Sequence, residues 1–187
     1  MTEDERIVEI LKRLRPYAPF WEFPDKSTKE YGIVKDFIDA LSGIGVLPYR
    51  QIVAQKPDPP DFKATDHSGR AIGVELTELV SEEAIRENIK VKGKQEHYVY
   101  KDWTPADFIC AVQERLDNKA HKQYNGGPYD ELHLVIFTDE PVLTYEECEK
   151  LLKAHVFKTA NQLRRAYVLF SYDPGSKTYP IVELKLA

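Results

Sequence analysis

Apolar residues in the first third of the chain recur at helical spacing and then at strand spacing. Residues 3–14 carry Ile, Val and Leu on one helical stripe, and a second stripe begins near Ser27 and ends at SGIGVLP, residues 42–48. Three strand-like runs follow, RQIVAQ, DFKATD and AIGVEL, with KPDPP after the first and the turn signal HSG after the second. We therefore expect two helices followed by three short strands.

The second half of the chain alternates helical and strand patterns. TPADFICAVQERLDNKAHKQY predicts a helix with Thr104 as N-cap and Pro105 at the first helical position. ELHLVIFTD has the length and apolarity of a buried central strand. TYEECEKLLKAHVF predicts a helix with a capping box from Thr144 to Glu147, and RAYVLFSY and TYPIVELKL predict two final strands. SEEAIREN predicts a short helix before a basic, aromatic-bearing loop.

The order of these elements predicts an α/β fold with a mixed central sheet flanked by helices. Strands without a helix between them pair antiparallel, whereas a strand that follows a helical crossover lies parallel to a neighbour. We find no internal repeat, low-complexity tract or linker. One domain is expected over residues 1–187, with a core of helix, three antiparallel strands, helix and strand at about 27–138 and a C-terminal helix and two strands at 144–187.

Composition narrows the class of protein. The 187 residues are 42% hydrophobic and 30% charged, which suits one globular core and excludes a disordered chain. The chain has no apolar run long enough to span a bilayer and no secretory signal pattern. We therefore expect a cytoplasmic protein without a membrane partner, with Cys110 and Cys148 as free thiols. The net charge of −5 means that any nucleic-acid contact comes from local patches.

The hairpin PDPPDFKATDHSGRAIGVELTEL places acids where strands are normally apolar. If Ser68 and Gly69 form the turn, Asp61 faces Leu76. A change of one residue in the length of the turn places Asp61 directly opposite Glu75. Cross-strand neighbours have Cβ atoms about 4.5–5.5 Å apart. Two carboxylates at that separation repel by on the order of 4 kcal/mol at an effective dielectric of 20. A hard cation, Mg²⁺ or Mn²⁺, would relieve this repulsion, and the alternative is a pair of solvated surface acids.

Two lysines and one further acid are expected near this pair. In the helix that starts at residue 105, Lys119 continues the inward apolar stripe that ends at Leu116, and Lys122 lies one step further on. Either residue can place an ammonium group beside the acids, and the alternative is a lysine that snorkels at the helix end. Glu30 on the preceding helix is a candidate metal ligand, unless it forms a capping box with Ser27.

Asp61 and Glu75-Leu76-Thr77, set within this order of elements, resemble the PD-(D/E)XK superfamily of restriction-endonuclease-like nucleases. PPDF is similar to the first acidic motif and GVELTE to the second, and the resemblance covers about residues 27–138. It implies a metal site formed by Asp61, Glu75 and the Leu76 carbonyl, with Glu30 reaching the metal directly or through water.

The chain departs from the family pattern at Thr77, which stands where the family has a lysine. The resemblance implies that this lysine has migrated to the following helix, as Lys119 in preference to Lys122. Lys119 would then orient the attacking water, and Thr77 would support the site by hydrogen bonding.

The resemblance implies a Mg²⁺- or Mn²⁺-dependent nuclease, with DNA as the expected substrate and endonucleolytic cleavage as the expected reaction. RNA remains open as a substrate, and a homodimer is plausible because many relatives pair two active sites. Thr77 also leaves open a catalytically inactive module that binds nucleic acid or serves in assembly. The acidic charge leaves open a protein-interaction domain that binds a basic partner.

A basic loop offers a candidate nucleic-acid surface. Its lysines would position phosphates and its aromatic side chains would stack on bases. The alternative is a solvated loop whose aromatic residues anchor it to the core. The candidate nucleic-acid-binding residues are Lys90, Lys92, Lys94, Lys101 and Tyr98.

Overall fold

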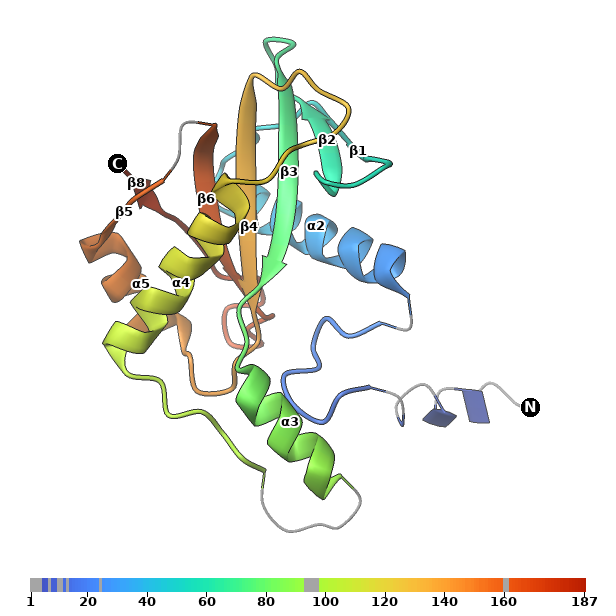
Figure 1. Cartoon of the computed structure of the whole chain (residues 1–187), viewed down its shortest axis with the longest axis vertical. Helices are drawn as coiled ribbons and strands as arrows, with labels where there is room; N and C mark the ends of the chain where they lie inside the picture. The colour runs from blue at the N-terminus through green and yellow to red at the C-terminus, as the bar shows by residue number, and fades with distance from the viewer. Residues whose placement is uncertain are drawn as a thin grey trace.

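A six-stranded mixed sheet forms the centre of the computed structural model, which describes residues 5–6, 8–9, 12, 14–23, 25–92, 98–159 and 162–187 (Figure 1). Strands β1–β2–β3 pair antiparallel, β3–β4–β6 pair parallel, and β7 is antiparallel to β6. The expected antiparallel group and the parallel arrival of β4 are thus confirmed. In sheet order the strands are β1 (Gln51–Ala54), β2 (Phe62–Thr65), β3 (Ala71–Glu78), β4 (Glu131–Thr138), β6 (Leu163–Phe170) and β7 (Ile181–Glu183).

Helices cover both faces of this sheet. Helix α2 (Lys26–Gly43) packs on one face, where its apolar side meets Val74 and Leu76 of β3. Helices α4 (Pro105–Ala120) and α5 (Tyr145–Ala154) pack on the other face (Figure 1). Helix α3 (Glu82–Val91) follows the end of β3. Alternate residues of β3 therefore face α2 and α4, and Glu75 belongs to the α4 side.

The C-terminal part differs from the expected pair of long strands. The segment TYPIVELKL divides into β7 and the two-residue strand β8 (Lys185–Leu186), which leaves the main sheet. Strand β8 pairs parallel with β5 (Val156–Phe157), where the sequence predicted helix. Helix α5 ends at Ala154 because Phe157 is fully buried in the core from an extended conformation.

Two of the helix starts test the capping predictions directly. Helix α4 begins as expected, with Thr104 and Asp107 forming a reciprocal capping box and Pro105 at the first position. The predicted box at the start of α5 is wrong, because the side chain of Thr144 makes no capping hydrogen bond.

The predicted capping box at Ser27 is also wrong. Asp25 is the N-cap of α2 and accepts a hydrogen bond from the amide of Thr28 at 2.8 Å. Ser27 instead donates its hydroxyl to the Asp25 carboxylate. Glu30 therefore does not cap the helix, and its carboxylate is free to take part in the site described below.

Of the N-terminal helix expected over residues 3–14, the described residues 5–6, 8–9 and 12 are helical, whereas Ile7, Ile10 and Leu11 lie outside the described residues. The described segment 14–23 has no helix, and Tyr17 and Trp21 anchor it with 2% and 3% of their surfaces exposed. Among the described residues, none of the helices combines the length and apolarity that a membrane crossing requires.

Candidate metal and catalytic site

The hairpin of β2 and β3 brings the two predicted acids together. Extended by one residue, its register sets Asp61 directly opposite Glu75. This is the second of the two registers that the sequence left open. It arises because the turn closes with a hydrogen bond from the Asp66 amide to the Arg70 carbonyl and so encloses three residues rather than two.

Asp61 lies at a bare edge of β3. Strand β2 begins only at Phe62, and the carboxylate of Asp61 accepts a hydrogen bond from the Leu76 amide at 2.7 Å. Within a strand the N–H and C=O of one residue point to the same edge. The Leu76 carbonyl therefore faces the edge where Asp61 lies, which groups a carboxylate with a backbone oxygen.

Glu75 is buried beneath two ammonium groups from the end of α4. Its side chain is 4% exposed, and its Oε1 lies 2.5 Å from Lys119 Nζ and 3.1 Å from Lys122 Nζ. Glu75 Oε2 is buried and has no hydrogen-bond partner among the described residues. Both candidate lysines thus reach the same acid. Lys119 is the closer and the more buried, with 15% of its side chain exposed against 42% for Lys122.

Two acids on the other side of the sheet edge join Asp61. Glu30, Asp58 and Asp61 each present a carboxylate oxygen, and these oxygens lie within 4.8 Å of one another. Lys26 pairs with Glu30 at 3.2 Å and also with Asp58. Sequence reasoning missed Asp58 and Lys26. The available signal for Asp58 was its place in the same PDPPD run, three residues before Asp61.

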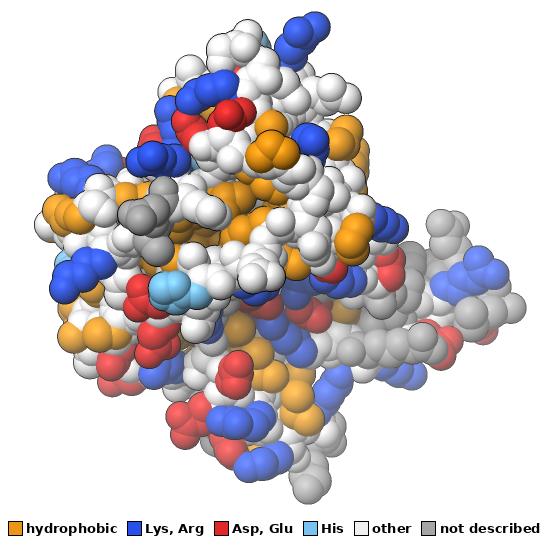
Figure 2. Space-filling view, turned by 45° about the horizontal axis from the view of Figure 1, so that its top comes forward, with side chains coloured by type: hydrophobic (Ala, Val, Ile, Leu, Met, Phe, Trp, Pro, Cys, Tyr) orange, Lys and Arg blue, Asp and Glu red, His pale blue; other side chains and the backbone are white. Residues whose placement is uncertain are grey.

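All of these groups line one open pocket of about 500 Å³ between the first turn of α2 and the C-terminal end of α4. Figure 2 shows acidic and basic side chains gathered in the hollow across the middle of this face. Thr77 lines the same pocket, two residues beyond Glu75 on the same face of β3. Its hydroxyl makes no hydrogen bond to another described residue, so the expected supporting contact is not formed there.

The electrostatics of the pocket favour a cation. Burial, followed by the neighbouring charge of Glu75, raises the pKa of Asp61 to about 7. Burial also lowers the pKa of Lys119 below its ordinary value. A divalent ion would hold Asp61 in its ionised form near neutral pH.

The donor set fits a hard divalent ion. It consists of carboxylate oxygens and one backbone carbonyl at a single edge, which are the ligands that Mg²⁺ and Mn²⁺ prefer. Oε2 of buried Glu75 is an acceptor that the described residues do not satisfy, and such groups are rare in folded proteins. Glu30, Asp58 and Asp61 are the acids whose oxygens lie close enough together to share one ion. Glu75 is not part of that group and contacts Lys119 and Lys122 instead.

The described part of the predicted basic loop does not line this pocket, since Lys90, Lys92, Lys101 and Tyr98 are absent from its lining. Lys90 pairs with Glu87 at 2.6 Å on the surface of α3. The ammonium group of Lys101 lies 4.7 Å from the ring centre of Trp103, whose indole donates to the buried carboxylate of Glu140.

The remaining candidates of the loop are Lys92, Tyr98 and Lys94. Lys92 Nζ donates to the backbone carbonyls of Lys12 and Leu14, at 2.6 Å and 2.7 Å. Tyr98 is 62% exposed, and Lys94 lies outside the described residues. Three of the four candidate lysines therefore have partners within the protein.

Comparison of the chain with protein-family models, with curated proteins and with solved structures finds no match in any of the three. The function is therefore inferred from the residues themselves and from their arrangement.

Proposed function

We propose that this protein is a metal-dependent nuclease of the PD-(D/E)XK type that hydrolyses phosphodiester bonds in nucleic acid, with Mg²⁺ or Mn²⁺ as cofactor. The observation that carries the proposal is the convergence of Asp61, buried Glu75 and the Leu76 carbonyl with the ammonium group of Lys119 in one open pocket. An ordinary buried ion pair between Glu75 and Lys119 would explain neither the nearby Asp61 nor the Glu75 oxygen that has no partner among the described residues.

The arrangement of elements supports the same proposal. Helix α2 is followed by three antiparallel strands, the α4 crossover and the parallel strand β4. The acids lie where β2 is short and β3 continues, and the lysines come from α4. This order is the one that the PD-(D/E)XK resemblance implies, with the lysine moved from the strand to the following helix.

Each side chain has a distinct part in the proposed reaction. A bound divalent ion would polarise the scissile phosphate and lower the pKa of a water molecule. Asp61 and Glu75 would hold the ion, and Glu30 and Asp58 would complete its surroundings. Lys119, fixed by burial, would orient the water and neutralise negative charge as it develops on the phosphate.

The direct test is incubation with plasmid DNA, single-stranded DNA and RNA in the presence of Mg²⁺, Mn²⁺ or EDTA. We expect cleavage that requires a metal ion and falls by at least about 100-fold in Asp61→Asn and in Lys119→Met. Asp39→Asn is a matched control, because Asp39 forms an exposed pair with Lys35 further along α2. Circular dichroism checks that each variant is folded.

Cleavage that survives both Asp61→Asn and Glu75→Gln would overturn the assignment. Metal binding and nucleic-acid binding without any cleavage would instead identify the catalytically inactive relative that Thr77 leaves open. DNA is the first substrate to test, and the resemblance leaves a homodimer plausible.

A further inference from the structure

The carboxylates on both sides of the pocket are neutralised by exposed lysines. Lys26, 68% exposed, pairs with Glu30 and with Asp58 on the α2 side. Lys122, 42% exposed, pairs with Glu75 on the α4 side. These ammonium groups lie against the oxygens that the proposed function assigns to a divalent ion. A lysine and a metal ion therefore compete for the same carboxylates.

The charge of the pocket makes this competition matter for an anionic substrate. Its lining contains four lysines and five carboxylates, which gives a formal charge of −1. A pocket of that charge repels a phosphodiester, whereas one divalent ion changes the formal charge to +1. The lysines are Lys26, Lys29, Lys119 and Lys122, and the acids are Glu30, Asp58, Asp61, Glu75 and Glu78.

We propose that Lys26 and Lys122 are phosphate-binding residues that divalent-ion binding releases from the site's carboxylates, so that nucleic acid binds tightly only to the metal-loaded protein. This inference rests on the proposed function and adds a binding mode to it. The released ammonium groups contact the phosphates on either side of the scissile one.

The energetics allow the exchange. An exposed lysine–carboxylate pair contributes little to stability, because water and salt screen the two charges. A divalent ion held by several carboxylates easily displaces such a pair, and the flexible stem of lysine lets the ammonium group turn to a nearby phosphate. Lys119 is 15% exposed and has little freedom to leave, which separates its part from that of the two exposed lysines.

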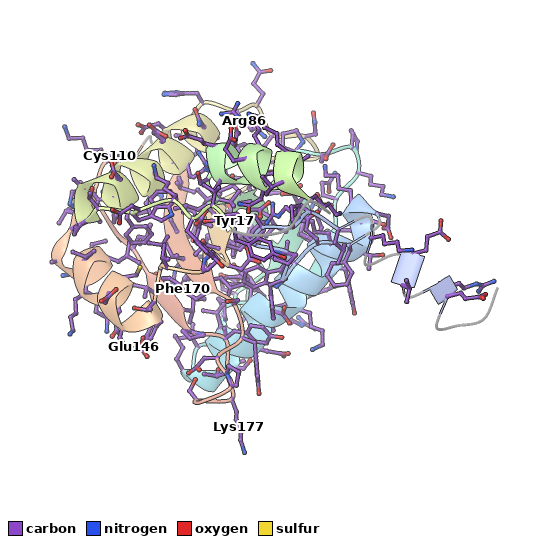
Figure 3. The ribbon with its side chains drawn as sticks, turned by 90° about the horizontal axis from the view of Figure 1, so that it is seen from below. Tyr17, Arg86, Cys110, Glu146, Phe170 and Lys177 are labelled. Carbon is purple, nitrogen blue, oxygen red and sulfur yellow. The ribbon has the colours of Figure 1, made fainter. Side chains whose placement is uncertain are left out.

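The positions of the two lysines define a path for the nucleic-acid backbone. Lys26 lies in the first turn of α2 and Lys122 just beyond the end of α4, and these helices pack on opposite faces of the sheet (Figure 3). The phosphates therefore cross the edge of β3 from the α2 side to the α4 side, with the metal between them.

The first experiment measures metal binding alone, by calorimetric titration of Ca²⁺ into the protein. Lys26→Met removes the competing cation, so we expect Ca²⁺ to bind about 2- to 5-fold more tightly than to the wild type. Lys26→Arg keeps the competing charge and is expected to bind Ca²⁺ like the wild type.

The second experiment measures binding of a short labelled DNA oligonucleotide by fluorescence anisotropy, with Ca²⁺ or with EDTA. We expect at least about 10-fold tighter binding with Ca²⁺ for the wild type. In Ca²⁺, Lys26→Met and Lys122→Met each weaken binding by about 3- to 10-fold and reduce the slope of log K against log salt by about 1. One substitution at Lys26 thus strengthens metal binding and weakens DNA binding, which a merely structural lysine would not do.

The matched control is Lys35→Met, because Lys35 is a 62% exposed lysine on the same helix that pairs with Asp39 outside the pocket. It is expected to change neither constant. The inference is overturned if wild-type DNA binding is equally tight in EDTA, if Ca²⁺ does not bind, or if Lys26→Met leaves both constants unchanged.

The experiments distinguish a failure of the lysine exchange from a failure of the proposed nuclease function. If both titrations behave as expected but Mg²⁺ supports no cleavage, the lysine exchange stands and the nuclease assignment fails. If Mg²⁺-dependent cleavage occurs and both lysine variants bind DNA like the wild type, the nuclease assignment stands and the exchange fails.

Discussion

The ion pair between Glu75 and Lys119 is expected to stabilise the metal-free protein far more than the neighbouring pair between Glu75 and Lys122. Both ammonium groups contact the same oxygen, Glu75 Oε1, at 2.5 Å and 3.1 Å. The two pairs differ mainly in burial, because 15% of the Lys119 side chain is exposed against 42% for Lys122. Double-mutant cycles with Glu75→Gln separate their contributions.

Burial sets the expected magnitudes. Removing one partner of a buried ion pair costs about 3–5 kcal/mol, because the other charge is left without compensation. Since Lys122 still shares the charge of Glu75 when Lys119 is replaced, we expect a coupling energy of about 2–3 kcal/mol for Glu75 with Lys119. The more exposed Lys122 should couple by less than about 1 kcal/mol.

The assay is urea unfolding in EDTA, followed by tryptophan fluorescence, for the wild type, each single variant and each double variant. Glu75→Gln alone should lower the free energy of unfolding by about 3–5 kcal/mol, because it leaves the buried ammonium group of Lys119 without its partner. Adding Lys119→Met should recover most of that loss, because no buried charge then remains unpaired. A coupling below about 0.5 kcal/mol for Lys119, or one equal to that of Lys122, would refute the reasoning.

Three further predictions concern the carboxylates and the core. In EDTA the free energy of unfolding should fall as pH rises from about 4 to about 7, by up to about 1.4 kcal/mol per unit, because the pKa of Asp61 is raised to about 7 and its protonated form is favoured in the folded state. Urea titrations of Asp61→Asn should lack this slope, and an unchanged slope would contradict the burial argument. Gly73→Ala would place a Cβ 2.6 Å from Leu132 Cδ2, so we expect a loss of about 1–3 kcal/mol in urea unfolding, and a neutral result would show that Leu132 moves aside freely. Tyr17→Phe removes the hydroxyl that donates to buried Glu140 at 2.6 Å, and we expect it to lower the free energy of unfolding by about 1–3 kcal/mol in the same assay. A loss below about 0.5 kcal/mol would mean that the other donors to the Glu140 carboxylate suffice.

The topology of the first four strands could be predicted from the sequence because connection length limits the choices. Short loops such as HSG permit only antiparallel pairing, and the segment that contains α4 is long enough for a parallel crossover. Strands β5 and β8 gave no such signal. A pairing of two residues depends on which distant segments the packed core brings together, and local periodicity carries no information about that.

Helix starts show a second limit of sequence reasoning. Asp25 and Ser27 both suit an N-cap, and only two residues separate them. The spacing to Glu30 favoured Ser27, but the chain begins its helical turn earlier and Asp25 takes the cap, with Ser27 as its donor. Capping residues compete, and the entry path of the chain decides between them.

The site itself was predictable where a period fixed the direction of a side chain. Alternation along β3 placed Glu75, and the helical stripe of α4 placed Lys119. Asp58 and Lys26 were missed because an irregular PDPP segment and an exposed first turn have no such period. The basic loop was predicted to bind nucleic acid because it contains several lysines. The number of lysines does not reveal that Lys92 donates to backbone carbonyls within the protein.

A proline explains why this edge of the sheet is free to form a site. If the pairing of β2 and β3 continued past Phe62, Pro60 would lie opposite Leu76, in a position where the two residues would exchange backbone hydrogen bonds. Proline has no N–H to donate, so the Leu76 carbonyl lacks its ladder donor, while the Leu76 amide is taken by Asp61. The residue that ends the ladder thus leaves a backbone oxygen and a carboxylate side by side. The PDPPD run is therefore a structural requirement of the proposed metal site as well as the source of two of its acids.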